Sequence, residues 1–182
     1  MRAAAIALAL LLSAACNDAP APTLGGDFVL TNQDGRRMAL HDLAGQRVLL
    51  FFGYTHCPDA CPTMLSKLTR VYRLLGPDAR RVTTVFVSVD PDRDSPAALK
   101  EYLSYFAIPV VGMTGTKAEI DRTIHAYGGR YEITPSRSAA GPSVSHTTWL
   151  YLIDDQGQLR QQFDPSADPE KIAGFVRQVI DS

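Results

Sequence analysis

The sequence predicts an α/β sandwich with a central sheet, and three observations carry this expectation. Residues 47–54 (RVLLFFGY) and 82–89 (VTTVFVSV) are continuous apolar runs, the pattern of strands buried within a parallel sheet. The segment between them repeats its apolar residues at a spacing of three and four, which indicates a helix. Further helices and strands alternate downstream, as is typical of layered α/β domains.

The domain is expected to begin with a β-hairpin. Two strand-like runs within 28–40 flank Asp34-Gly35, a pair that favours a tight hairpin turn. The helix between the two apolar runs starts near Cys61 and ends at Gly76-Pro77, where glycine and proline stop it.

The rest of the chain supplies the outer elements of the sandwich. Ser95-Pro96 gives one helix a cap and a first-turn proline, and Thr116 forms a capping box with Glu119 at the start of another. The C-terminal part is expected to contain a strand at 147–154, a turn at 155–157, a strand at 159–163 and a helix from about Asp168.

The composition is that of one compact globular domain without a charge bias. The chain has 182 residues, of which 46% are hydrophobic and 20% charged, and its formal net charge is −1. No block of like charges forms a basic arm or an acidic tail. We therefore expect no nucleic-acid partner.

The N-terminal residues predict secretion and a lipid anchor. Residues 1–15 combine a positive start, an apolar run and small residues, the pattern of a signal peptide too short to span a membrane. The string LLSAAC resembles a bacterial lipobox and indicates lipidation of Cys16, while plain cleavage after SAA is the alternative. Residues 16–23 then form a flexible tether, and 24–182 form the folded domain.

Two further cysteines lie at the start of the predicted helix. Cys57 is expected at the strand-to-helix turn and Cys61 in the first helical turn, so both sulfur atoms can lie on one face. The free N–H groups of a helix start favour thiolates there. The pair fits disulfide exchange, a soft metal or a structural disulfide; the last is disfavoured because so short a bridge restrains little chain entropy.

His146 is the third candidate. It follows the segment 131–145, which is rich in Ser, Gly, Ala and Pro and is expected to be a long loop of functional importance. This loop delivers His146 directly before the strand expected at 147–154, where α/β sheets present groups towards their edge.

Three stretches give the chain a family resemblance: GYTHCPDACPTML at 53–65, VSVDPDRDSP at 87–96 and SHTTWLYLIDDQG at 145–157. In order and spacing they resemble the SCO/SenC family of membrane-tethered copper proteins. The resemblance implies a thioredoxin-like sandwich with a mixed central sheet, helices on both faces and an N-terminal β-hairpin. It also implies copper ligands at Cys57, Cys61 and His146. Ser145 and Ala60 depart mildly from the family pattern, and neither removes a ligand.

Other residues near these motifs are weaker candidates. Asp90 could approach the same site, but we expect it to lie in a loop whose Arg93 pairs locally. His56 could tune Cys57, but we expect it to be solvated. Further residues are expected to play no part in the site: His41 and His125 as exposed, Met64 and Met113 as core residues, and Trp149 as a packing residue.

The function implied by the resemblance is that of a copper-binding metallochaperone, not an enzyme in the turnover sense. It would help assemble the binuclear copper centre of cytochrome c oxidase, since two thiolates and an imidazole suit Cu(I), and Cu(II) could add an oxygen ligand. The implied partners are the copper subunit of the oxidase and another copper chaperone or a thiol reductant.

The alternative function is that of a thiol–disulfide oxidoreductase. It would use Cys57 and Cys61 as a redox disulfide to reduce cysteines of the oxidase subunit or of another extracytoplasmic partner. For both functions we expect a lipid-anchored protein at the extracytoplasmic, periplasmic face of the bacterial inner membrane.

Overall fold

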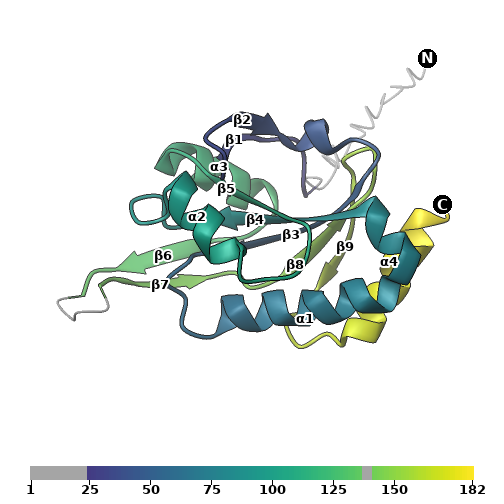
Figure 1. Ribbon diagram of the computed structural model, residues 1–182. Coiled ribbons are helices and arrows are strands. Elements are labelled where there is room, and N and C mark those ends of the chain that lie inside the picture. Colours follow the sequence, from purple (N-terminus) through teal and green to yellow (C-terminus); the bar gives the residue numbers. More distant parts are fainter. Residues whose placement is uncertain (1–23, 137–140) are drawn as a thin grey trace, which may run out of the picture.

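The computed structural model describes residues 24–136 and 141–182 (Figure 1). The predicted signal peptide at 1–15 and the predicted tether at 16–23 lie outside the described residues. None of the described helices is long and apolar enough to cross a membrane.

The described chain contains helices in alternation with strands. The strands are β1 (Val29–Asn32), β2 (Arg37–Ala39), β3 (Arg47–Gly53), β4 (Val82–Ser88), β5 (Val110–Thr114), β6 (Tyr131–Thr134), β7 (Ser143–His146), β8 (Leu150–Ile153) and β9 (Leu159–Phe163). The α-helices are α1 (Ala60–Leu75), α2 (Pro96–Leu103), α3 (Lys117–Ala126) and α4 (Pro169–Ile180), and two short 3-10 helices are η1 (Leu40–Leu43) and η2 (Gly76–Arg81).

Seven strands form the central sheet, in the order β2-β1-β5-β4-β3-β8-β9. The two apolar runs pair in parallel as β3 and β4, with Phe51 opposite Phe86, and every residue of β3 is buried. The other neighbour of β3 is β8, which runs antiparallel to it. The prediction of a mixed sheet with an N-terminal hairpin, β1 and β2, is confirmed.

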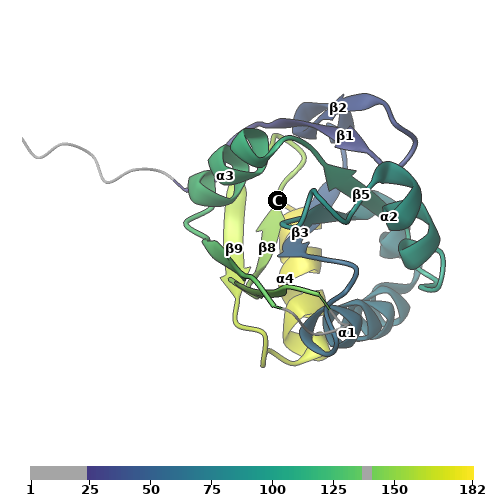
Figure 2. The ribbon, with the colours of Figure 1, turned by 90° about the vertical axis from the view of Figure 1, so that its left-hand side faces the viewer.

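Helices cover both faces of this sheet, as predicted. Figure 2 shows α1, α2 and α4 on one side of the strands and α3 on the other. On the first face α2 lies so close to β5 that a Cβ atom on Gly112 would come within 2.5 Å of Leu103. On the second face the ring of Tyr127, which ends α3, meets the ring of Phe52 edge-on at 6.1 Å.

The predicted helix starts are also confirmed. Ser95 caps α2 by accepting a hydrogen bond from the backbone of Ala98, and Pro96 is the first residue of that helix. Thr116 and Glu119 form the expected capping box of α3. Such caps satisfy N–H groups that have no partner within the helix.

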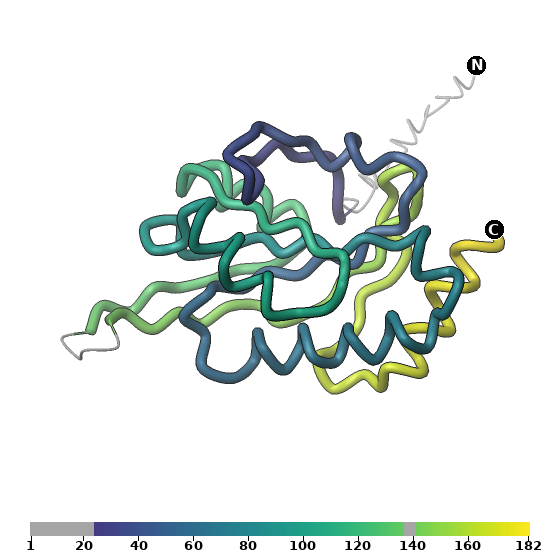
Figure 3. Tube along the Cα trace, viewed as in Figure 1, coloured from purple at the N-terminus to yellow at the C-terminus, as the bar shows by residue number. Residues whose placement is uncertain are grey.

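The segment 131–145 is not a loop, so this prediction was wrong. Strands β6 and β7 pair there as a separate antiparallel hairpin, which extends from the body of the domain (Figures 1 and 3). His146 is the last residue of β7, and the next strand of the central sheet, β8, begins at Leu150. The hairpin forms because Tyr131 and Ile133 face His146 and Val144 across the pair, while the residues between them point to solvent.

Candidate metal centre

The turn between β3 and α1 supplies both cysteines. The backbone N–H of Cys57 donates to the carbonyl oxygen of Tyr54 at 3.2 Å, which closes the turn, and Cys61 lies in the first turn of α1. The backbone N–H of Cys61 donates to the sulfur of Cys57 at 3.4 Å. The expectation that the two sulfur atoms lie on one side is confirmed.

Gly53, the last residue of β3, lets Cys61 pack closely against the sheet because it has no side chain. A Cβ atom on Gly53 would lie 2.7 Å from the sulfur of Cys61 and 2.8 Å from the ring of Phe86. Cys61 is therefore buried between the sheet and its own helix, with 1% of its surface exposed, whereas Cys57 is half-buried. Cys57 is thus the more exposed of the two cysteines.

The hairpin supplies the imidazole. His146 lies on the domain-facing side of β7, and its Nε2 atom is 3.8 Å from the sulfur of Cys61. Its Nδ1 atom is 3.0 Å from the carbonyl oxygen of Thr147. Because a carbonyl oxygen only accepts hydrogen bonds, Nδ1 carries the proton and the lone pair of Nε2 faces the sulfur atoms.

The three side chains form a compact set of possible metal ligands. One ligand atom from each of Cys57, Cys61 and His146 lies within 4.8 Å of the other two. Within residues 24–136 and 141–182, they are the one group of at least three such residues that could hold a metal ion. Two sulfurs and one imidazole nitrogen form a soft set with few ligands, which fits Cu(I) better than hard cations such as Mg²⁺ or Ca²⁺.

Burial sets the protonation of the apo site. It raises the pKa of the Cys61 thiol well above its usual range, and the nearby Cys57 and Asp94 act in the same direction. The expectation that the helix start favours a thiolate is therefore wrong for Cys61, because desolvation outweighs the helix dipole. Burial also lowers the pKa of His146. A metal bound by this set thus meets a neutral imidazole and displaces a thiol proton.

The buried carboxylate of Asp94 holds the turn between β3 and α1, which carries Cys57, through hydrogen bonds. Asp94, which has no exposed surface, accepts hydrogen bonds from the backbone N–H and the hydroxyl of Thr55 at 3.0 and 2.6 Å. It also accepts one from the hydroxyl of Ser88 at 2.6 Å. Asp94 and Tyr54 were not among the residues predicted for the site. The signal for Asp94 is the cluster of acids directly after β4, where parallel strands present functional groups.

Asp90 and His56 are not part of the three-residue set. Asp90 is buried and forms an ion pair with Arg93, so the predicted local pairing of Arg93 is confirmed. His56 is exposed as expected, and its Nδ1 lies 3.8 Å from a carboxylate oxygen of Asp94.

The other minor candidates are mostly as predicted. The expected exposed histidines and core methionines are confirmed: His41, His125, Met64 and Met113. Trp149, expected to be a packing residue, lies between β7 and β8 and has 40% of its surface exposed. Its packing role stays a prediction.

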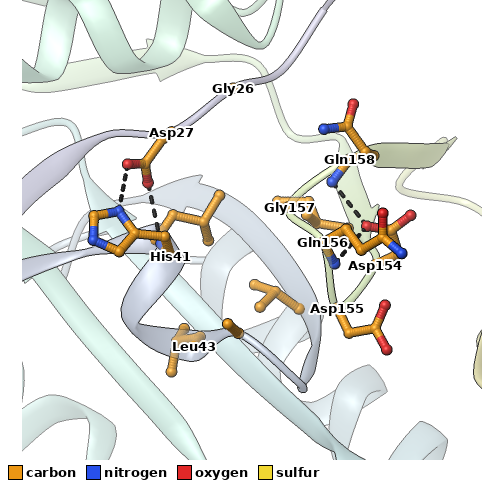
Figure 4. A pocket seen from close by; sticks show the side chains of 13 residues that line it. Gly26, Asp27, His41, Leu43, Asp154, Asp155, Gln156, Gly157 and Gln158 are labelled. Atoms are coloured by element: carbon orange, nitrogen blue, oxygen red, sulfur yellow. Dashed lines mark hydrogen bonds and ion pairs between the residues drawn. The ribbon is translucent and has the colours of Figure 1, made fainter.

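The opposite end of the sheet holds a cavity of about 250 Å³ (Figure 4). Its floor is apolar and includes Val48 and Ile153 from the central strands. At its edge the carboxylate of Asp27 lies 2.6 Å from Nδ1 of His41. Asp154 accepts two backbone hydrogen bonds within its own turn, so these polar groups already have partners.

The fold and the site together define a thioredoxin-like α/β protein with a cluster of two cysteines and one histidine. The sequence profile of the SCO1/SenC family matches residues 17–181. The chain belongs to this family.

Individual relatives agree with this assignment. The chain is 38% identical to the mitochondrial SCO1 homologue of Mus musculus over 157 residues, which is 85% of this chain and 55% of the mouse protein. It thus spans about half the length of that relative. Bradyrhizobium japonicum ScoI, solved with copper bound, is 39% identical with a TM-score of 0.78, covering 86% of this chain and 99% of the other. A SCO1/SenC family lipoprotein from Bacillus anthracis is 25% identical with a TM-score of 0.74, covering 87% and 96%.

Proposed function

We propose that this protein is a copper-binding metallochaperone that helps assemble the binuclear copper centre of cytochrome c oxidase. Cys57, Cys61 and His146 are the proposed copper ligands. The observation that carries the proposal is their convergence from two separate parts of the fold, within 4.8 Å of one another, in a chain of the SCO1/SenC family. The copper-bound state of the Bradyrhizobium relative supports the choice of metal.

The chemistry of the set suits delivery of copper rather than its permanent storage. Two thiolates and an imidazole leave a coordination position free, through which a ligand of the copper subunit of the oxidase can enter. Cys57, the more exposed of the two cysteines, would be the side from which this exchange takes place. The same opening would serve another copper chaperone that loads the site or a thiol reductant that prepares it.

Elemental analysis of the full-length protein, reduced and purified without oxygen, tests the proposal. We expect about one copper atom per chain, because the structure offers one set of three ligands among its described residues. His41→Gln is the matched control, since it removes a histidine at the other end of the sheet and should keep the same copper content. A copper-free protein with a readily reduced disulfide would contradict a copper function.

A thiol–disulfide oxidoreductase is the second candidate, and the unequal exposure of the two cysteine residues favours it. Exchange requires one accessible thiol to attack and a second to resolve the mixed disulfide, which matches the half-buried Cys57 and the buried Cys61. Trapping the protein with a small disulfide separates the alternatives. Rapid capture of a mixed disulfide at Cys57 by the copper-free dithiol, with no copper bound under any condition, would favour the oxidoreductase.

We also propose that the protein is a lipoprotein, with residues 1–15 as the signal peptide and Cys16 as the lipidated residue. The Bacillus anthracis relative is described as a lipoprotein, which supports this anchor. Residues 16–23 would then tether the domain to the extracytoplasmic face of the inner membrane. Cys16→Ala should release the protein into the soluble fraction of the cell envelope. A variant that stays as firmly membrane-bound as the parent would contradict the anchor.

A further inference from the structure

The loop between β4 and α2 contacts both halves of the proposed metal centre. On one side Asp94 holds the cysteine turn through Thr55. On the other side Arg93, the residue before it, reaches the hairpin that carries His146. The two contacts come from adjacent residues of one short loop, so this loop joins two parts of the fold that belong to different sheets.

Arg93 makes several kinds of contact in this position. Its guanidinium pairs with the buried carboxylate of Asp90 and donates a hydrogen bond to the carbonyl oxygen of Pro142 at 3.0 Å. The guanidinium carbon also lies 5.8 Å from the centre of the Tyr54 ring, a cation–π distance. A planar group with several donors can make all of these contacts at once.

Tyr54, which contacts Arg93, also contacts the imidazole ring of His146. Its ring meets the ring of His146 edge-on at 5.8 Å, with an interplanar angle of 88°. Arg93 and Tyr54 thus contact Pro142, directly before β7, and His146, the last residue of β7.

In the hairpin, Val144 and Ile133 pack against the hydrophobic core, and further hydrogen bonds anchor it at the end nearest His146. Thr147 and Arg130 exchange hydrogen bonds there, and the hydroxyl of Tyr131 donates to Asp121 of α3 at 2.7 Å. These contacts hold the base and the middle of the hairpin. Arg93 adds a polar contact beyond them, four residues away from His146, and can limit how far β7 moves from the cysteine turn.

We propose that Arg93 is a positioning residue of the metal centre. With Tyr54 it holds β7 against the cysteine turn and so fixes Nε2 of His146 beside Cys61. The effect on copper rests on the proposed function, in which His146 is a ligand. The contact itself is a property of the apo protein and can be measured without copper.

Arg93→Gln in the full-length protein tests the proposal with two measurements. Amide hydrogen exchange of residues 143–146 in the apo protein should become faster, because β7 loses a fixed contact. The dissociation constant for Cu(II) should rise about three- to tenfold, with weaker nitrogen coupling in the electron paramagnetic resonance spectrum. The reduction potential of the cysteine pair should not change. Arg93→Lys keeps a cation beside Asp90 and should fall between the two proteins, and it replaces the glutamine variant if that one does not fold.

A double-mutant cycle with His146→Ala shows whether Arg93 acts through the imidazole. In the alanine background, Arg93→Gln should cause no further loss of Cu(II) affinity. Arg160→Gln is the matched control, because Arg160 pairs with the nearly buried Asp154 at the far end of the sheet and should leave copper binding unchanged.

The possible outcomes separate the two proposals. Parental exchange rates in Arg93→Gln, or additive losses in the cycle, would overturn the positioning role while leaving the ligand set intact. If His146→Ala itself kept full Cu(II) affinity, the ligand set would be wrong, and the effect of Arg93 on copper would fall with it.

Discussion

The two ends of the central sheet each present a histidine, in opposite surroundings. Where β3 ends, His146 is partly buried and its Nδ1 faces a backbone carbonyl oxygen. Where β3 begins, His41 is exposed and its Nδ1 faces the carboxylate of Asp27 (Figure 4). The two sites lie at opposite ends of β3, a strand of seven residues that spans about 20 Å.

These surroundings move the two pKa values in opposite directions. Burial lowers the pKa of His146, whereas the hydrogen bond and charge of Asp27 raise the pKa of His41. A neutral imidazole keeps a lone pair for a metal, and a protonated one does not. In this protein, burial beside the two cysteines favours the neutral form of His146, which can bind a metal. The carboxylate of Asp27 favours the protonated form of His41, which forms an ion pair.

Removal of the Cys57 or the Cys61 thiol should have the largest effect on metal binding at the His146 end of the sheet. Cys57→Ser or Cys61→Ser leaves two ligands and should weaken Cu(I) binding by more than about 100-fold, because an alcohol is a poor ligand for a soft metal. Competition with a Cu(I) chelator measures this. Cys16→Ala is the control for a cysteine outside the described domain, and it should retain the parental affinity. If the Cys57 and Cys61 variants bound Cu(I) as tightly as the parent, the proposed ligand set would be wrong.

His146→Ala should have the next largest effect, and it is specific to the oxidation state. Cu(II) favours imidazole and higher coordination, so its affinity should fall at least about tenfold, while the two thiolates still hold Cu(I). The reduction potential of the cysteine pair should change little, because exchange needs only the sulfurs. Equilibrium titration with each ion measures the difference. The domain should still fold, since His146 lies on a hairpin outside the central sheet.

Gly53→Ala should destabilise the metal end by packing alone. The added Cβ atom would lie 2.7 Å from the sulfur of Cys61 and 2.8 Å from Phe86, so we expect a loss of about 1–3 kcal/mol in the free energy of unfolding. Urea denaturation of the apo protein measures it. Gly174→Ala is the control, because nothing lies within 4 Å of its added atom in α4 and alanine favours a helix. A neutral Gly53 variant would show that the cysteine turn is looser than its contacts indicate.

His41→Gln should have the smallest effect and should depend on pH. The raised pKa of His41 gives a stabilising contribution that is complete below pH 6.5 and is lost as the pH rises through the folded-state value. The variant should therefore lose slightly more stability at pH 5.5 than at pH 8, measured by urea midpoints. The opposite pH dependence would mean that the ion pair with Asp27 does not form in solution.

The sequence predicted the central sheet well because its strands are continuous apolar runs, as in β3 and β4, whose burial leaves one arrangement available. It also named Cys57, Cys61 and His146 together as candidate ligands, because motifs carry them, and the structure brings one ligand atom of each within 4.8 Å of the others. It did not predict the hairpin. The inward residues Ile133 and Val144 lie among serine, glycine and proline, so their alternation over four-residue strands is too short to stand out from a loop.

The residues that hold the ligands in place could not be predicted from local sequence patterns either. Asp94 and Tyr54 act through contacts with residues far away in the chain, as in the bond between Asp94 and Thr55 across 39 positions. Desolvation of Cys61 likewise depends on how closely α1 packs against the sheet, which no local propensity reports.

The attachment of the imidazole to a separate two-stranded sheet gives a bound metal a second role, as a cross-link. Cys61 and His146 are 85 positions apart, and a metal bonded to both would close that stretch of chain into a loop. Such a closure lowers the entropy of the unfolded chain, as a disulfide of the same span would. Loading the site would then tie the unfolding of the hairpin to that of the central sheet, so that resistance of β6 and β7 to proteolysis reports the state of the metal.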